Sequence, residues 1–143
     1  MPNTTSNVVL YATLAARYPV INIANAATTA QTLLITAAST GTIVTDILFR
    51  TSDATVRLWN IIICATGSQA TAQNARVVVS IPATSGNNGS TAIASLAALV
   101  PSLFDIDLAG NRVITLESGQ SIYVENQATT GGFNYITAKA RDY

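Results

Sequence analysis

The chain has 143 residues and no net charge, because its seven basic residues balance its seven acidic ones. It has no histidine and only one cysteine, which excludes a Cys/His zinc site or a disulfide within one chain. The six arginines are spread singly and Lys139 is the only lysine, so we expect no binding to nucleic acid or to an anionic membrane surface.

The same composition argues against cofactor-dependent chemistry. Histidine is the usual proton shuttle at neutral pH and the commonest metal ligand, and the chain has none. We therefore expect a protein that is not an enzyme and has no cofactor and no small-molecule substrate. The sequence shows neither a signal-peptide pattern nor a run of about 20 apolar residues. We accordingly expect synthesis in the cytoplasm and no membrane-spanning helix.

Residues 1–18 are expected to form an extended N-terminal arm, followed by one domain over residues 19–143. Ordering a residue costs roughly 1–2 kcal/mol of backbone entropy, whereas burying a large apolar side chain returns roughly 1.5–3 kcal/mol. The arm's few large side chains do not clearly offset that cost, so we expect it to become ordered only against a partner. The large apolar residues of the arm that could bind such a partner are Val8, Val9, Leu10, Tyr11, Leu14 and Tyr18.

After Pro19, short runs rich in β-branched residues alternate with turn-forming residues, which is typical of an all-β protein. In residues 42–50, strict alternation places the odd-numbered side chains on one face. The even-numbered ones, which include Asp46 and Arg50, are expected on the other, wetter face. The Ala-rich segment 92–100 fits either a strand or one short helix.

The run 55–65 is long enough to be a central strand of a sheet. With the other runs it gives about eight strands, which predicts an antiparallel β-sandwich of jelly-roll type. The expected strands cover residues 20–23, 32–37, 42–50, 55–65, 75–81, 112–116, 120–126 and 133–141.

Asp105 and Asp107 are the best candidates for a catalytic or metal-binding pair. Two residues apart on a strand, they would share a face at a spacing that a glycosidase pair could use. The segment from Asp105 to Asn111 also resembles the start of a calcium loop, but Ala109 and Leu116 occupy ligand positions. A tight turn whose backbone is bonded by Asp107 and Asn111 is the stronger interpretation, so we expect no metal site.

Aromatic residues gather in the last two expected strands. Tyr123, Tyr135 and Tyr143 are candidates for a subunit interface, where large rings anchor a partner. In a glycan-binding module, exposed rings such as Tyr123 and Tyr135 would instead form a stacking platform, with Trp59 as a further member. Core packing is the third interpretation, and it is favoured for Trp59 and Phe133.

Four local patterns follow one another along the chain. They are a glycine-bearing turn followed by a strand, a piece of a central strand that includes Trp59, a Leu-Glu-Ser-Gly turn followed by a strand, and a closing strand with an acidic-aromatic end. The patterns lie at residues 39–47, 56–59, 116–122 and 133–143. Their order resembles small β-sandwich head decoration, or cement, proteins of tailed bacteriophages. Where members of that family often carry a glycine pair, this chain has Ala140 and Arg141.

This resemblance implies a virion structural protein that binds the outer surface of the phage head as a homotrimer. Its partners would be the major capsid protein and sister copies of the chain. The arm would lie across neighbouring capsid subunits, and bridging of capsomers would stabilise the shell. A phage tail or fibre module that recognises host glycans is the alternative.

Overall fold

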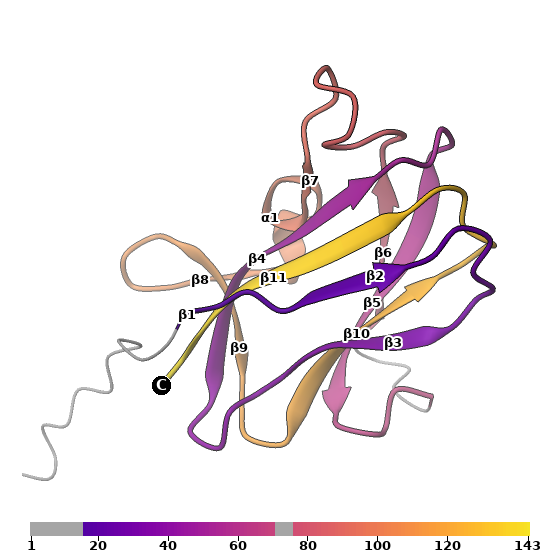
Figure 1. Ribbon diagram of the computed structural model, residues 1–143. Coiled ribbons are helices and arrows are strands. Elements are labelled where there is room, and N and C mark those ends of the chain that lie inside the picture. Colours follow the sequence, from indigo (N-terminus) through magenta and orange to yellow (C-terminus); the bar gives the residue numbers. More distant parts are fainter. Residues whose placement is uncertain (1–15, 71–75) are drawn as a thin grey trace, which may run out of the picture.

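Two antiparallel β-sheets pack against each other in the computed structural model, which describes residues 16–70 and 76–143 (Figure 1). The expected all-β sandwich is confirmed. The described residues form eleven strands, because three two-residue strands add to the eight expected ones. Within this described part of the chain, no helix is long and apolar enough to cross a membrane.

The larger sheet has β4 and β11 at its centre and runs in the order β1-β11-β4-β9-β8. Strand β2 also pairs with β11, and β7 pairs with β4. The strands of this sheet are β1 (Ala16–Arg17), β2 (Val20–Ile23), β4 (Thr42–Thr51), β7 (Ala94–Ser95), β8 (Asp105–Ile106), β9 (Arg112–Leu116) and β11 (Asn134–Asp142).

The smaller sheet runs in the order β3-β10-β5-β6, so the long run around Trp59 is a central strand as expected. The Ala-rich segment contains both expected alternatives, because β7 is followed directly by the one-turn helix α1 (Leu96–Leu99) and then by the short 3₁₀ helix η1 (Pro101–Leu103). The strands of the smaller sheet are β3 (Gln31–Thr36), β5 (Arg57–Ala65), β6 (Arg76–Ile81) and β10 (Gln120–Asn126).

The core lies between the two sheets and is built from large side chains of both. Phe49 and Trp59 meet edge to face, with ring centroids 5.4 Å apart, and Trp59 is only 1% exposed. Each such buried side chain contributes roughly 1.5–3 kcal/mol. Further fully buried members of this core are Ile47, Ile61, Ile81, Leu96, Leu116, Ile122, Val124 and Ile136.

The alternation predicted for β4 is wrong in its first half. Val44 and Ile47 are both buried, although they are three residues apart. The register explains this, because Val44 and Asp46 pair with the adjacent residues Ala140 and Lys139, which leaves Thr45 as an extra residue on β4. Such a β-bulge reverses which side chains face the core.

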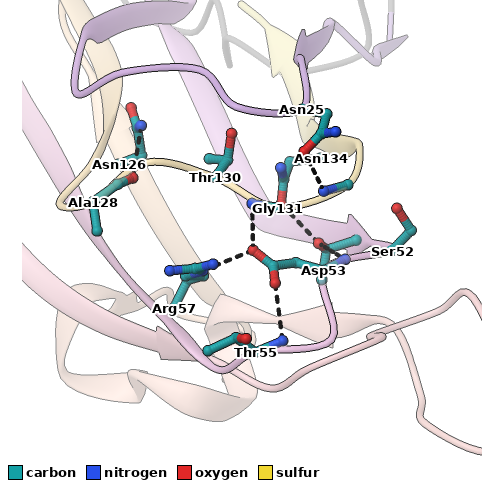
Figure 2. Close-up of polar contacts among 12 residues, drawn as sticks. Asn25, Ser52, Asp53, Thr55, Arg57, Asn126, Ala128, Thr130, Gly131 and Asn134 are labelled. Atoms are coloured by element: carbon teal, nitrogen blue, oxygen red, sulfur yellow. Dashed lines mark hydrogen bonds and ion pairs between the residues drawn. The ribbon is translucent and has the colours of Figure 1, made fainter.

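The turn between β4 and β5 is fixed by the carboxylate of Asp53, which is 3% exposed (Figure 2). Its Oδ1 accepts a hydrogen bond from the backbone N–H of Thr55 at 2.9 Å. Its Oδ2 accepts from Arg57 Nε and from the backbone N–H of Gly131, both at 2.7 Å. One side chain therefore joins this turn to the loop before β11. We call these contacts the Asp53 junction.

Polar side chains around the Asp53 junction extend it to the loop between β2 and β3. Asn25 Oδ1 accepts from the backbone N–H of Gly132 at 2.9 Å, and Thr130 Oγ1 donates to the carbonyl of Ala24 at 2.7 Å. The buried amide of Asn126 donates to three backbone carbonyls of the same region. Because buried polar groups must be paired, these bonds hold three loops at one end of the sandwich.

The glycine pair before β11 allows this close packing. A Cβ on Gly131 would lie 2.9 Å from Asp53 Oδ1, which is closer than real Cβ contacts. Gly132 has a φ of +61°, a conformation that other residues adopt only with strain. The pair separates β10 from β11, and Gly131 donates its N–H to the Asp53 carboxylate.

We expect Asp53→Asn to lower the free energy of unfolding by about 2–4 kcal/mol, because the buried ion pair is broken and donors are left facing an amide. Urea denaturation followed by Trp59 fluorescence measures the change. Asp105→Asn is the matched control, because Asp105 is exposed on β8, and it should stay within about 0.5 kcal/mol of the parent. Equal stability of the two variants would contradict the role of the Asp53 junction.

The junction should also set the acid stability of the fold. Burial alone would raise the pKa of Asp53, but the hydrogen bonds from Arg57, Thr55 and Gly131 outweigh it and hold this pKa below its ordinary value. A lowered folded-state pKa gives stability that is present above the unfolded pKa of about 4 and is lost as pH falls through the folded pKa. The free energy of unfolding, measured between pH 7 and pH 2, should therefore fall more steeply with decreasing pH for the parent than for Asp53→Asn.

Candidate functional site: the arm root and the adjacent groove

The first described strand lies at the end of the segment expected to be the arm. In β1, Ala16 pairs with Arg141 and Arg17 pairs with Ala140 of β11, so these two residues belong to the larger sheet. The predicted arm therefore enters the folded domain before residue 18. Of its candidate binding residues, only Tyr18 is described, and it is 62% exposed. The other candidates, Val8, Val9, Leu10, Tyr11 and Leu14, lie outside the described residues.

Arg17 fastens β1 to three other strands. Its Nη2 lies 2.8 Å from Asp142 Oδ1 and donates to the carbonyl of Thr36 at 3.0 Å and to Thr42 Oγ1 at 3.1 Å. The buried hydroxyl of Thr42 donates in turn to Asp142 Oδ1 at 2.6 Å and accepts from the N–H of Ala38 at 2.9 Å. We call these contacts the arm root, because they fix the point at which residues 1–15 join the sheet.

Tyr143 packs beside the arm root. Its N–H donates to the carbonyl of Gly41 at 3.2 Å, and Thr40 Oγ1 donates to the carbonyl of Tyr143 at 2.6 Å. Gly41 has a φ of +101°, and a Cβ there would lie 3.1 Å from the Tyr143 ring. The ring is half-buried over this glycine turn, so Tyr143 is partly engaged within its own chain.

An open groove of about 840 Å³ lies next to the arm root. One wall is the β8–β9 hairpin, which projects from the sandwich (Figure 1), and the floor is the outer face of β4 and β11. Arg141 belongs both to this groove and to the pair that holds Ala16, so the two features are continuous. The charged side chains that line the groove are Asp46, Asp107, Arg112, Lys139 and Arg141, and Ile43 and Ile106 are among its apolar ones.

Both acidic side chains of the groove accept hydrogen bonds from nearby groups of the same chain. Asp46 accepts from Ser95 Oγ at 2.6 Å and from the N–H of Ala97 at 3.1 Å. Asp107 Oδ1 accepts from the N–H groups of Asn111 at 2.8 Å and Ala109 at 2.9 Å. The bonds from Asn111 hold the pKa of Asp107 below its ordinary value.

The basic side chains of the groove make fewer hydrogen bonds with the described residues than the acidic ones do. Arg112 donates through Nη1 to the carbonyl of Ala97 at 2.6 Å. Lys139 and Arg141 are exposed, and their side chains make no hydrogen bond or ion pair with the described residues. The groove therefore offers positive charge to a partner, although the whole chain is neutral.

Asp105 and Asp107, the candidate catalytic or metal-binding pair, lie on β8 and in the turn that follows it. Asp107 caps the turn before Asn111, as the stronger interpretation predicted, and Asp105 pairs with Val113 on β9. Among residues 16–70 and 76–143, no group of three or more His, Cys, Asp or Glu side chains could hold a metal ion. Burial raises the pKa of the Cys64 thiol, which disfavours the nucleophilic thiolate there.

The aromatic candidates divide between the core and the surface. Trp59 is in the core, and Tyr123 is 6% exposed and accepts at its hydroxyl from the N–H of Gly67 at 2.9 Å. Neither ring can serve as the exposed glycan platform that the sequence analysis considered, and Tyr123 packs within its own subunit. Tyr135 is half-buried and contacts Phe133, with ring centroids 5.2 Å apart.

No family model, curated protein or solved structure matches this chain.

The arm root could not be predicted from the sequence, because Arg17 and Asp142 lie near opposite ends of the chain and neither belongs to a local motif. Lys139, the only lysine, was the one available sequence signal for the groove.

We expect Arg17→Ala to loosen the arm root with little effect on the sandwich. Losing an ion pair that is partly exposed and two hydrogen bonds should cost about 1 kcal/mol. Hydrogen–deuterium exchange should accelerate in β1 and at the end of β11, while β5 and β10 stay protected. Arg141→Ala is the matched control on the neighbouring position, and equal exchange in both variants would contradict the special role of Arg17.

Proposed function

We propose that this protein is a virion structural protein that binds the outer surface of a bacteriophage head as a homotrimer and stabilises the shell. The arm root is the observation that carries the proposal. Backbone pairing of the edge strand β1 with β11 and the contacts of Arg17 attach a segment with several large apolar residues to the larger sheet. A pulling force on that segment would be transmitted to the sandwich through the hydrogen bonds between β1 and β11, and not through a loop.

The proposal includes a jelly-roll topology, which the pairing supports. When the two-residue strands are set aside, eight strands remain. The first pairs with the last (β2 with β11), the second with the seventh (β3 with β10), the third with the sixth (β4 with β9), and the fourth with the fifth (β5 with β6). This nested pairing is what rolling one long antiparallel pair into two sheets produces.

Binding would combine weak contacts into lasting attachment. Residues 1–15 carry no charged side chain and alternate polar with apolar stretches, so they suit an extended segment laid on a protein surface. Three arms on one trimer would bind together, which raises overall affinity far above that of one arm. The zero net charge means that neighbouring copies repel each other weakly.

Under this proposal the major capsid protein and two sister copies are the partners, and assembly takes place in the host cytoplasm. Of the three tyrosines expected at a subunit interface, Tyr135 and Tyr143 are half-buried and keep surface that a sister copy could contact. The glycan-binding alternative loses two of its three rings to the core, and we do not pursue it. No bound nucleic acid, membrane or small molecule is part of the mechanism.

Deleting residues 1–15 tests the proposal, because it removes the arm but keeps β1 and the arm root. We expect a folded trimer, with a mass by light scattering that is three times the mass of the shortened chain. We expect it to stay in the supernatant when phage heads lacking the protein are sedimented, whereas the full chain pellets with them.

A full-length variant with Val8, Val9, Leu10 and Tyr11 replaced by Ser is the matched control for the deletion. It keeps the length of the arm but removes its apolar side chains, and it should also fail to pellet. Full occupancy of heads by either variant would refute the arm mechanism. A monomeric parent chain that leaves heads undecorated would refute the proposed function itself.

A further inference from the structure

We infer that the groove between the β8–β9 hairpin and the outer face of β4 and β11 binds a carboxylate-bearing segment of the capsid protein. This inference rests on the proposed function, and it specifies which end of the sandwich faces the shell. It also names the chemistry of the partner, which neither the arm nor the fold specifies.

Charge complementarity is the first argument. The groove lining carries three basic side chains, Arg112, Lys139 and Arg141, and two acidic ones, Asp46 and Asp107, so its net charge is +1. Lys139 and Arg141 stand on alternate positions of β11 and point to the same side of the sheet. Asp46 lies opposite Lys139 across the strands, but within the described residues neither Lys139 nor Arg141 makes an ion pair, so a carboxylate entering the groove can pair with them.

The apolar rim of the groove is the second argument. Leu108, at the tip of the β8–β9 hairpin, is fully exposed, and Ile106 is 63% exposed. An apolar side chain costs little when exposed alone, but two on one projecting hairpin beside a groove mark a contact surface. A partner segment that carries apolar residues beside its carboxylate would cover this rim while it pairs with Lys139 or Arg141.

Continuity with the arm root is the third argument, because Arg141 lies opposite Ala16 in the sheet. The arm thus leaves the sandwich beside the groove, and both can contact one capsid surface at the same time. The exposed apolar residues of the smaller sheet, such as Leu58 and Val78, lie on a different sheet from the arm root. The groove end is therefore the end that we assign to the shell.

Lys139 makes a sharp experiment feasible because it is the only lysine. A water-soluble carbodiimide joins a lysine amine to a carboxylate only when the two are in direct contact. We expect treatment of decorated heads to couple Lys139, within the tryptic peptide 113–141, to an Asp or Glu of the capsid protein. Mass spectrometry identifies the two coupled residues and distinguishes this product from coupling at the N-terminal amine.

Lys139→Arg is the matched control, because it keeps the charge but cannot form the amide. This variant should decorate heads normally and give no coupled peptide from the groove. Lys139→Glu with Arg141→Glu should weaken head binding by about tenfold or more, since like charges would face each other across the interface. Arg50→Glu, at the other end of the same face, changes the charge by as much as either single reversal and should leave binding nearly unchanged.

The outcomes separate this inference from the proposed function. Decoration of heads without coupling at Lys139, together with normal binding of the double reversal, would overturn the groove assignment and leave the proposed function standing. Coupling of Lys139 to a sister copy would also overturn it, because the groove would then be a subunit interface. If the parent chain fails to bind heads, the proposed function and this inference both fall.

Discussion

Pairing of β11 on both of its edges is the constraint on which the rest of the structure depends. One edge pairs with β4 along nearly the whole strand, and the other pairs with β2 and β1. This arrangement places the last strand of the chain between strands from the beginning of the chain and β4. It also brings together residues from the beginning, middle and end of the sequence, and both the arm root and the groove are built from those residues.

Each end of β11 is held by a different kind of contact. At the Asn134 end, the Asp53 junction ties three loops together through a buried carboxylate and short hydrogen bonds. At the Asp142 end, a more exposed ion pair with Arg17 holds β1. Buried, fully bonded groups give rigidity, whereas partly exposed ion pairs contribute little energy and can rearrange. The sandwich is therefore firm at the junction and adjustable where the arm joins it.

The sequence predicted the sheets well and the contacts between them poorly. Eight strands and the turn at Asp107 could be predicted, because alternation and turn residues act over a few neighbouring positions. The bulge at Thr45 could not, since it arises from pairing with β11 rather than from β4 itself. The contacts of Asp53 and Arg17 could not be predicted for the same reason. Asp53 bonds to Gly131 and Arg17 pairs with Asp142, and only the folded topology brings these residues together.

A chain with no net charge can still carry a locally positive surface when its charges are unevenly distributed. Within the described residues, Asp53 pairs with Arg57 and Asp142 pairs with Arg17, so these charges cancel locally. The groove lining carries three basic and two acidic side chains, so it is locally positive where the sequence total is zero. Long-range repulsion between copies therefore stays weak while a short-range preference for carboxylates remains. That combination suits a protein that must crowd together on a surface and still bind it in one orientation.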